Sequence, residues 1–325
     1  MNLFWVPCSL VLLAGCGSRT QERKNLSIGD ARVHAGMRVS LPARRLGLTW
    51  QMFDNAKTFE QRVTSRMAVV EPKCPREFEL EEYPGVRVKL MNGRRLTSWI
   101  FRTRFPRMLV VKIMPPEMAQ DHLEMFVHEY VLLDILQAQE IHNGFTAKFA
   151  HVGLQLFHPV GVVCPMIVME DVGESTLADL PPVSPIAEIA ALLLNQLKEV
   201  HATGFVHGDV HAGNIVWDGR NFNSFRFIDF GESRPFVDWK TRTHILPIQK
   251  RVSPVVNQDL LSRWERLGYP KSRRDDLSRL ATALGNYPVV TEFYKYVQSL
   301  EFDTVPKYDF WIQKFTKEAT SEASV

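Results

Sequence analysis

Two short segments in the second half of the chain carry residues suited to phosphate chemistry. They read His207-Gly208-Asp209-Val210-His211-Ala212-Gly213-Asn214 and Ile228-Asp229-Phe230-Gly231. A carboxylate such as Asp209 can accept the proton of a hydroxyl group, while Asn214 and Asp229 offer the oxygen ligands that Mg²⁺ prefers. An Asp followed five residues later by Asn, with Asp-Phe-Gly further along, therefore predicts a centre for phosphoryl transfer from ATP.

The residue that would hold the nucleotide phosphates lies upstream of these segments. Lys112 stands near the end of the apolar run Leu109-Val110-Val111-Lys112-Ile113, which is typical of a buried strand. Glu129 follows in a stretch with apolar residues at helical spacing, so we expect a helix over 123–136. A Lys112–Glu129 ion pair would direct the ammonium toward the α and β phosphates, so both residues are expected in the catalytic machinery.

These residues need a scaffold, and the apolar pattern predicts one in two parts. Strands are expected first, over 86–90, 99–101, 108–111 and up to 169, with Asn92-Gly93 as a hairpin turn. After Pro181-Pro182 helices dominate, and a wide apolar stripe over 186–200 predicts a largely buried helix. The fold class is therefore α+β, and the cleft between a strand-rich lobe and a helical lobe is a common ligand site.

Further motifs resemble the casein kinase I and vaccinia-related kinase branch of the protein-kinase-like superfamily. The resemblance covers about residues 80–318 and rests on the two segments above together with motifs nearer the C-terminus. These are Val206-His207-Gly208-Asp209, Ser272-Arg273-Arg274-Asp275-Asp276-Leu277, and the stretch from Glu292-Phe293-Tyr294 to Pro306-Lys307-Tyr308. The resemblance implies a two-lobed protein-kinase-like domain at 78–320, with an N-lobe at 78–170 and a C-lobe at 171–320.

The same resemblance implies roles for individual residues. Asp209 would be the catalytic base, Asn214 and Asp229 the Mg²⁺ ligands, and Asp276 the acid that braces the backbone of the catalytic loop. Met169-Glu170-Asp171 would be the hinge that pairs with adenine. With ATP and Mg²⁺ as the implied cofactors, the nucleotide site would comprise Lys112, Met169, Glu170, Asp171, Asn214 and Asp229.

Two positions depart from the usual kinase pattern. The Gly-rich phosphate loop should fall near 90–98, where Gly93 is the single glycine; whether Arg94 or Arg95 replaces it as a charge clamp is left open. Gly208 stands where kinases usually have an arginine that pairs with a phosphorylated activation loop, so activation by phosphorylation is not expected. A kinase that lacks the glycine loop and carries a signal segment also resembles a family of secreted parasite kinases.

His211 bears on which kind of molecule accepts the phosphoryl group, a protein or a small alcohol. By the resemblance, this residue stands where protein kinases place a lysine that contacts the γ-phosphate, so His211 is expected to be a catalytic residue that acts as a cation there. The pattern His-Gly-Asp-x-His-x-x-Asn is commoner in aminoglycoside and choline phosphotransferases. The longer match to casein kinase I favours a serine/threonine protein kinase with a protein substrate. Two alternatives stay open: a small-molecule kinase of the aminoglycoside or choline type, and a secreted pseudokinase that serves as a binding module.

The N-terminus predicts export from the cytosol. An apolar run over 3–13 leads to Ala14-Gly15-Cys16-Gly17-Ser18, the order found in a secretory signal. The run is shorter than the roughly 20 residues that span a bilayer. We therefore expect a signal segment at 1–16 and a secreted or secretory-lumen protein. A bacterial lipoprotein lipidated at Cys16 and an apolar element of the mature fold are the alternatives.

Residues 17–77 form a region of distinct composition. Residues 17–50 form a basic arm with seven basic and two acidic side chains. Apolar residues over 53–67 recur at helical spacing. The expected amphipathic helix would pack on the following domain or contact a membrane or a partner. The net charge of +3 does not indicate a nucleic-acid partner, and four cysteines, two of them within 1–16, exclude a disulfide scaffold.

Overall fold

The computed structural model describes residues 75–80, 85–91, 98–103, 108–115, 149–157, 162–237, 243–245 and 271–322, together with single helical positions between 118 and 136. The signal segment, the basic arm, the amphipathic helix, and Gly93, Arg94 and Arg95 lie outside the described residues, so the expectations for them stay predictions. Within the described part, no helix combines the length and the apolar character that a bilayer span requires.

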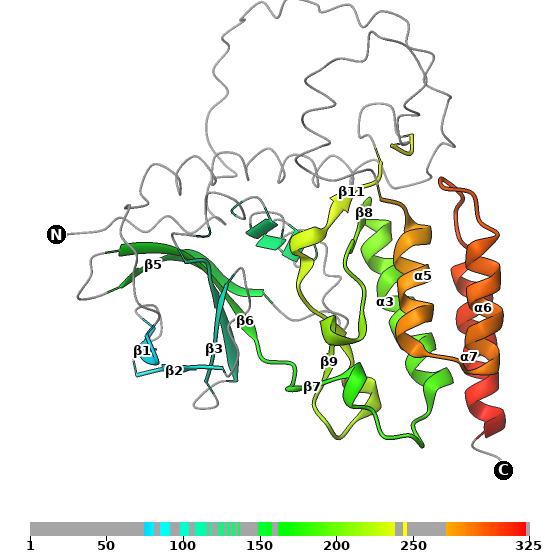
Figure 1. Ribbon diagram of the computed structural model, residues 1–325, viewed down its shortest axis with the longest axis horizontal. Helices are drawn as coiled ribbons and strands as arrows, with labels where there is room; N and C mark the ends of the chain where they lie inside the picture. The colour runs from blue at the N-terminus through cyan, green and yellow to red at the C-terminus, as the bar shows by residue number, and fades with distance from the viewer. Residues whose placement is uncertain are drawn as a thin grey trace, which may run out of the picture. The chain divides into compact units, whose positions relative to one another are not determined.

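A six-stranded antiparallel sheet forms the first part of the domain, in the order β1-β2-β3-β4-β6-β5 (Figure 1). Every second residue of β3 is buried, as expected for a strand with one face on a core. The register sets Ile100 of β3 and Ile167 of β6 on either side of Lys112 in β4. The predicted strands are confirmed as β2 Arg87–Leu90, β3 Trp99–Thr103, β4 Leu109–Ile113 and β6 Val162–Glu170, and the sheet also contains β1 Glu77–Glu79 and β5 Phe149–Phe157.

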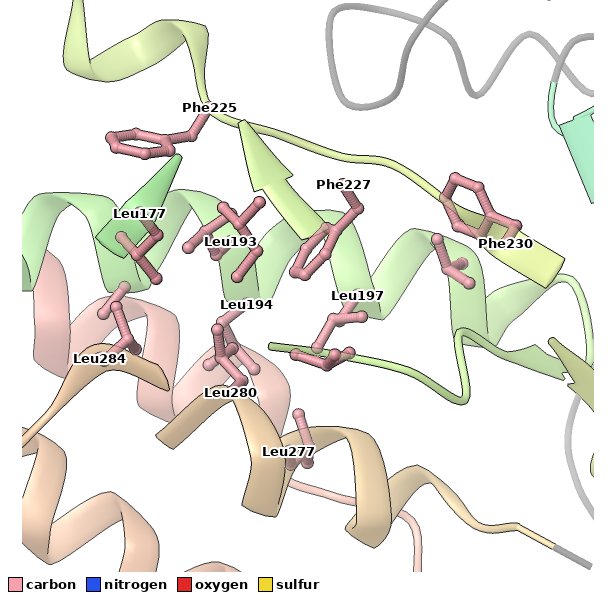
Figure 2. Packing of buried hydrophobic residues seen from close by; sticks show 14 of the residues in the cluster. Leu177, Leu193, Leu194, Leu197, Phe225, Phe227, Phe230, Leu277, Leu280 and Leu284 are labelled. Atoms are coloured by element: carbon pink, nitrogen blue, oxygen red, sulfur yellow. The ribbon is translucent and has the colours of Figure 1, made fainter. Parts of the chain in front are cut away.

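Helices form most of the second part, as the apolar pattern predicts. They are α3 Ile186–Ala202, α5 Arg273–Leu284, α6 Pro288–Gln298 and α7 Tyr308–Glu322. Helix α5 begins with a capping box between Ser272 and Asp275, and α6 begins with Pro288 at its first position. The predicted apolar stripe of α3 is buried against α5 and α7. Figure 2 shows Leu193, Leu194 and Leu197 of α3 between Phe227 and Leu280 in this core.

Short strands and single turns of 3₁₀ helix hold the two segments that carry Asp209 and Asp229. Strand β8 pairs with β11, and β9 lies between β7 and β10. The catalytic loop, residues 207–214, runs from β8 to β9, and the Asp-Phe-Gly segment lies between β10 and β11, so the β8–β11 and β9–β10 pairs bring both segments together. The bounds are β7 Ser175–Thr176, η2 Leu177–Asp179, β8 Phe205–Val206, η3 Ala212–Asn214, β9 Ile215–Trp217, η4 Phe222–Ser224, β10 Arg226–Phe227, η5 Phe230–Glu232 and β11 Arg234–Pro235.

Candidate active site

Lys112 connects the sheet with the Asp-Phe-Gly segment. Its Nζ donates to Glu129 Oε2 at 2.5 Å and to Asp229 Oδ1 at 3.0 Å. Burial disfavours the charge of Lys112, but the carboxylates of Glu129 and Asp229 outweigh burial and raise the pKa of this ammonium above its usual value. The predicted Lys112–Glu129 ion pair is therefore present, and the lysine stays a fixed positive charge across the physiological pH range.

Asp229 has a left-handed backbone conformation, which is uncommon for a residue other than glycine. It adopts φ 63° and ψ 71°, and among the described residues it is the one non-glycine with positive φ. Left-handed backbone costs an L-residue about 1–2 kcal/mol. Such strain persists where the surroundings hold a residue firmly, which is common at functional sites. Here the conformation presents the Asp229 carboxylate to Lys112.

The catalytic loop and helix α5 each hold one carboxylate oxygen of Asp209. Asn214 Nδ2 donates to Asp209 Oδ2 and to Asp209 O, both at 3.1 Å. Arg279 Nη1, from α5, donates to Asp209 Oδ1 at 3.1 Å. The Asp209 side chain is 35% exposed, so the carboxylate is held in place and still open to solvent. Such a group can reach an acceptor hydroxyl, as a general base must.

His207 fixes the distance between the catalytic loop and the Asp-Phe-Gly segment. The buried ring packs against Phe227 and Phe230. Its Nδ1 accepts the backbone N–H of Asp209, and its Nε2 lies 3.2 Å from Ile228 O. Burial lowers the pKa of His207 below its usual value, so a neutral ring with its proton on Nε2 satisfies both contacts.

Asp276 braces the catalytic loop from α5, as the resemblance implies. Its carboxylate accepts the backbone N–H groups of His207 and Gly208, at 2.6 and 2.9 Å. Its other neighbour is the ring of His201, which in turn contacts the hydroxyl of Tyr308 at 2.5 Å. Helix α5, helix α3 and the start of α7 thereby set the position of the backbone next to Asp209.

Gly208 is required by the packing of the loop. Its φ is +84°, and a Cβ atom built there would lie 2.1 Å from the backbone oxygen of Glu232. Lys271 Nζ donates to Gly208 O at 2.8 Å and to Glu232 Oε2 at 3.1 Å. The backbone of Glu232, just after the Asp-Phe-Gly segment, therefore lies where kinases usually have an arginine side chain, and the Lys271–Glu232 pair links it to the catalytic loop.

His211 makes a backbone contact within the loop. Its Nδ1 accepts the N–H of Gly213 at 3.1 Å, which caps the 3₁₀ turn η3. Its Nε2 lies 3.5 Å from Asp209 Oδ2, and the side chain is 52% exposed. A nitrogen that accepts a hydrogen bond carries no proton, so the cap requires the neutral ring. The cationic role that the resemblance implies for this position is not the one that the geometry favours.

The expected hinge contains both exposed and buried residues. Met169 packs at the edge of the core and Glu170 is exposed, whereas Asp171 is buried. The Asp171 amide donates to Met108 O, and its carboxylate binds Arg102 of β3, with Nε 2.6 Å from Oδ2. Arg102 also donates to Gly173 O at 2.7 Å. Asp171 therefore ties the hinge to the sheet, and its amide is already used in a strand contact.

Sequence reasoning did not identify Arg279, Lys271, Arg102, His201 or the role of Tyr308. One signal for Arg279 was present: it follows Asp276 by three residues on the same helix, and residues at that spacing share a helix face. The face of α5 that holds the catalytic loop through Asp276 therefore also carries Arg279. For Lys271 and Arg102 the partners are far apart in sequence, and no local pattern indicates them.

The fold and the central segment resemble known phosphotransferases. The model of the phosphotransferase enzyme family, APH, matches residues 167–235, which include the hinge, the catalytic loop and the Asp-Phe-Gly segment. The solved structure of vaccinia related kinase 3 matches with a TM-score of 0.51 and 15% sequence identity, over 83% of this chain and 96% of that chain. The chain therefore has the two-lobed protein-kinase-like fold, with a phosphotransferase-type segment at its centre.

Proposed function

We propose that the protein transfers the γ-phosphoryl group of ATP to a serine or threonine hydroxyl of a protein. The observation that carries the proposal is the pair of contacts made by Lys112 Nζ, to Glu129 Oε2 and to Asp229 Oδ1. This arrangement places a buried cation beside the carboxylate expected to hold the metal. The position of this buried ion pair next to Asp229 supports a role in holding the phosphates of a nucleotide.

The donor set around Asp229 fits Mg²⁺. Asn214 uses its Nδ2 for Asp209, so its side-chain oxygen is the atom left for a ligand, and Asp229 adds carboxylate oxygens. Mg²⁺ prefers oxygen ligands and is commonly bound by one or two side chains together with substrate phosphates. No group of three or more His, Cys, Asp or Glu residues forms a metal site in the described part of the chain. When bound, the ion would neutralise charge on the phosphates.

Asp209 would accept the proton in the transfer step. The acceptor oxygen bonds to the γ-phosphorus, the bond from that phosphorus to the β,γ-bridging oxygen breaks, and the hydroxyl proton passes to Asp209. ADP leaves with the electron pair of the broken bond. Asp276 and His207 act on this step indirectly, because they hold the backbone that carries Asp209.

A small-molecule acceptor is the second candidate, and one observation favours it. The match to the phosphotransferase enzyme family covers the catalytic loop, which contains His-Gly-Asp-x-His-x-x-Asn. The motifs near the C-terminus, including the Ser272–Asp275 capping box at the start of α5, favour the protein-kinase alternative. We give the protein acceptor priority, since those motifs extend over a longer part of the chain.

The two candidates are separated by one assay with two acceptor panels. The full chain is incubated with γ-labelled ATP and Mg²⁺, either with a casein-type protein or with aminoglycosides, choline and other small alcohols. We expect label in phosphoserine or phosphothreonine of the protein and none in Asp209→Asn. Label found only in a small alcohol would support the second candidate. No label in either panel, with ATP binding intact, would support a pseudokinase.

A further inference from the structure

Arg279 is a half-exposed arginine in contact with the proposed catalytic base. Its Nη1 lies 3.1 Å from Asp209 Oδ1, and its side chain is 51% exposed. The other oxygen of Asp209 accepts from Asn214, so the two carboxylate oxygens face different partners. Ion pairs this exposed contribute little to stability, so the guanidinium can exchange one anionic partner for another at small cost.

The other cations described near the site are already in use. Lys112 Nζ is bound to Glu129 and Asp229, and Lys271 Nζ is bound to Gly208 O and Glu232. The ring of His211 accepts a hydrogen bond from Gly213, which a protonated Nδ1 could not do. Arg279 therefore differs from the other cations described around Asp209, because it combines a permanent charge with a half-exposed side chain.

We propose that Arg279 is a catalytic residue that stabilises the transferred phosphoryl group, in place of the lysine that protein kinases carry at the position of His211. The inference rests on the proposed phosphoryl transfer, though not on the class of acceptor. In a reactive complex the acceptor oxygen lies about 3 Å from the base and about 3–3.5 Å from phosphorus. The phosphorus is then within about 7 Å of Asp209, inside the reach of an arginine side chain anchored beside that carboxylate.

This position explains how one arginine serves two states. Before the nucleotide binds, Arg279 pairs with Asp209 Oδ1. In the transition state, negative charge spreads over the equatorial oxygens of the phosphoryl group, and the guanidinium follows that charge. Its departure leaves Oδ1 to accept the hydroxyl proton. The positive charge thus comes from helix α5 and not from the catalytic loop itself.

The first test measures kcat and KM separately for variants of Arg279. Arg279→Gln should lower kcat about 100-fold, for transfer and for ATP hydrolysis alike, with the KM for ATP changed less than threefold. Arg279→Lys should keep at least a tenth of the activity, because the charge remains. The control is Arg220→Gln, which removes an exposed arginine from the loop after β9 and should leave kcat unchanged.

The second test asks whether a lysine in the loop replaces the arginine. In the Arg279→Gln background, adding His211→Lys should raise kcat at least tenfold, since it restores a cation at the usual kinase position. A double variant no more active than Arg279→Gln would overturn the proposal, and so would a loss of activity in Arg279→Gln that appears entirely in KM. If the wild-type chain neither transfers phosphate nor hydrolyses ATP, the proposed function itself is wrong. If the wild type is active and Arg279→Gln is equally active, the role of Arg279 alone is wrong.

Discussion

His201 Nε2 lies 2.9 Å from Oδ2 of Asp276, and the same oxygen accepts the backbone N–H of His207. Both side chains are buried, and they form a hydrogen bond with each other that needs no positive charge on the His201 ring. A neutral His201 donates from Nε2 to Asp276 and accepts at Nδ1 from the Tyr308 hydroxyl. Burial disfavours the charge of Asp276, but hydrogen bonds from His201 and from the loop outweigh it and lower its pKa.

This buried network predicts a stability that depends on pH. Burial lowers the pKa values of His201 and His207 below the ordinary value of about 6.5. The unfolded chain therefore binds protons near pH 6.5 that the folded chain does not, so the free energy of unfolding falls as the pH drops below that value. At higher pH both rings are neutral in either state and their contribution is constant.

Urea unfolding at pH 7.5, 6.5 and 5.5 checks this expectation. His201→Gln should lower the free energy of unfolding at pH 7.5 by about 1–3 kcal/mol, because a buried partner of Asp276 changes. The same variant should show a shallower loss of stability from pH 7.5 to 5.5 than the wild type, since one of the titrating groups is gone. Parallel curves for the two proteins would contradict the role of His201.

The second prediction compares two glycines with nearly the same backbone. Gly208 and Gly85 have φ values of +84° and +82°, but a Cβ atom at Gly85 meets nothing within 4 Å, and one at Gly208 meets Glu232 O at 2.1 Å. Gly85→Ala should cost about 1–2 kcal/mol, the strain of left-handed backbone. Gly208→Ala should cost about 3–5 kcal/mol, because overpacking adds to that strain, and it should nearly abolish transfer.

Thermal unfolding and a transfer assay on both variants provide the measurement. Gly208→Arg is informative as well, because it restores the side chain that most kinases have. The steric conflict predicts that this variant unfolds more readily and gains no dependence on phosphorylation. Equal losses of stability in Gly85→Ala and Gly208→Ala would show that the contact with Glu232 adjusts without cost.

The third prediction concerns the metal. Asp229→Asn should remove the stabilisation that ATP provides in the presence of Mg²⁺, because a charged oxygen ligand is lost. The matched control is Asp218→Asn, an exposed aspartate that accepts the backbone N–H groups of Arg220 and Asn221. Thermal shifts with ATP, with and without Mg²⁺, should show the metal-dependent part absent in Asp229→Asn and retained in Asp218→Asn. Equal metal-dependent shifts in both variants would exclude Asp229 as a ligand.

The sequence predicted those parts of the structure that depend on local pattern. Alternating burial in β3 and the apolar stripe of α3 follow directly from periodicity, and the spacing of Asp209, Asn214 and Asp229 indicated the chemistry. The ion pair of Lys112 with Glu129 could be predicted because a strand and the following helix are close in sequence as well as in space.

Contacts between distant parts of the chain were not predictable in this way. Arg102 and Asp171 are 69 residues apart, and their pairing depends on the order of strands in the sheet, which no local pattern specifies. The expectation that Asp171 serves adenine therefore missed its bond to β3. The contact of Arg279 likewise depends on which face of α5 turns toward the catalytic loop, and that face is determined by the packing of Leu277 and Leu280 into the core that α5 shares with α3 (Figure 2).

The last prediction separates two roles for His211, that of a cap and that of a cation. Its Nδ1 accepts the N–H of Gly213 at the start of η3, a contact that an asparagine side chain can also make. His211→Asn should therefore keep kcat within threefold of the wild type. His211→Ala and His211→Lys lack that acceptor and should both lose about 3- to 10-fold, which corresponds to one hydrogen bond of about 0.5–1.5 kcal/mol. Since Arg279 already supplies a charge beside Asp209, an added lysine brings no compensating gain in this background. Transfer rates of the three variants at one pH decide between the roles: a His211→Lys variant that keeps the wild-type rate while His211→Asn loses activity would show that position 211 acts through positive charge.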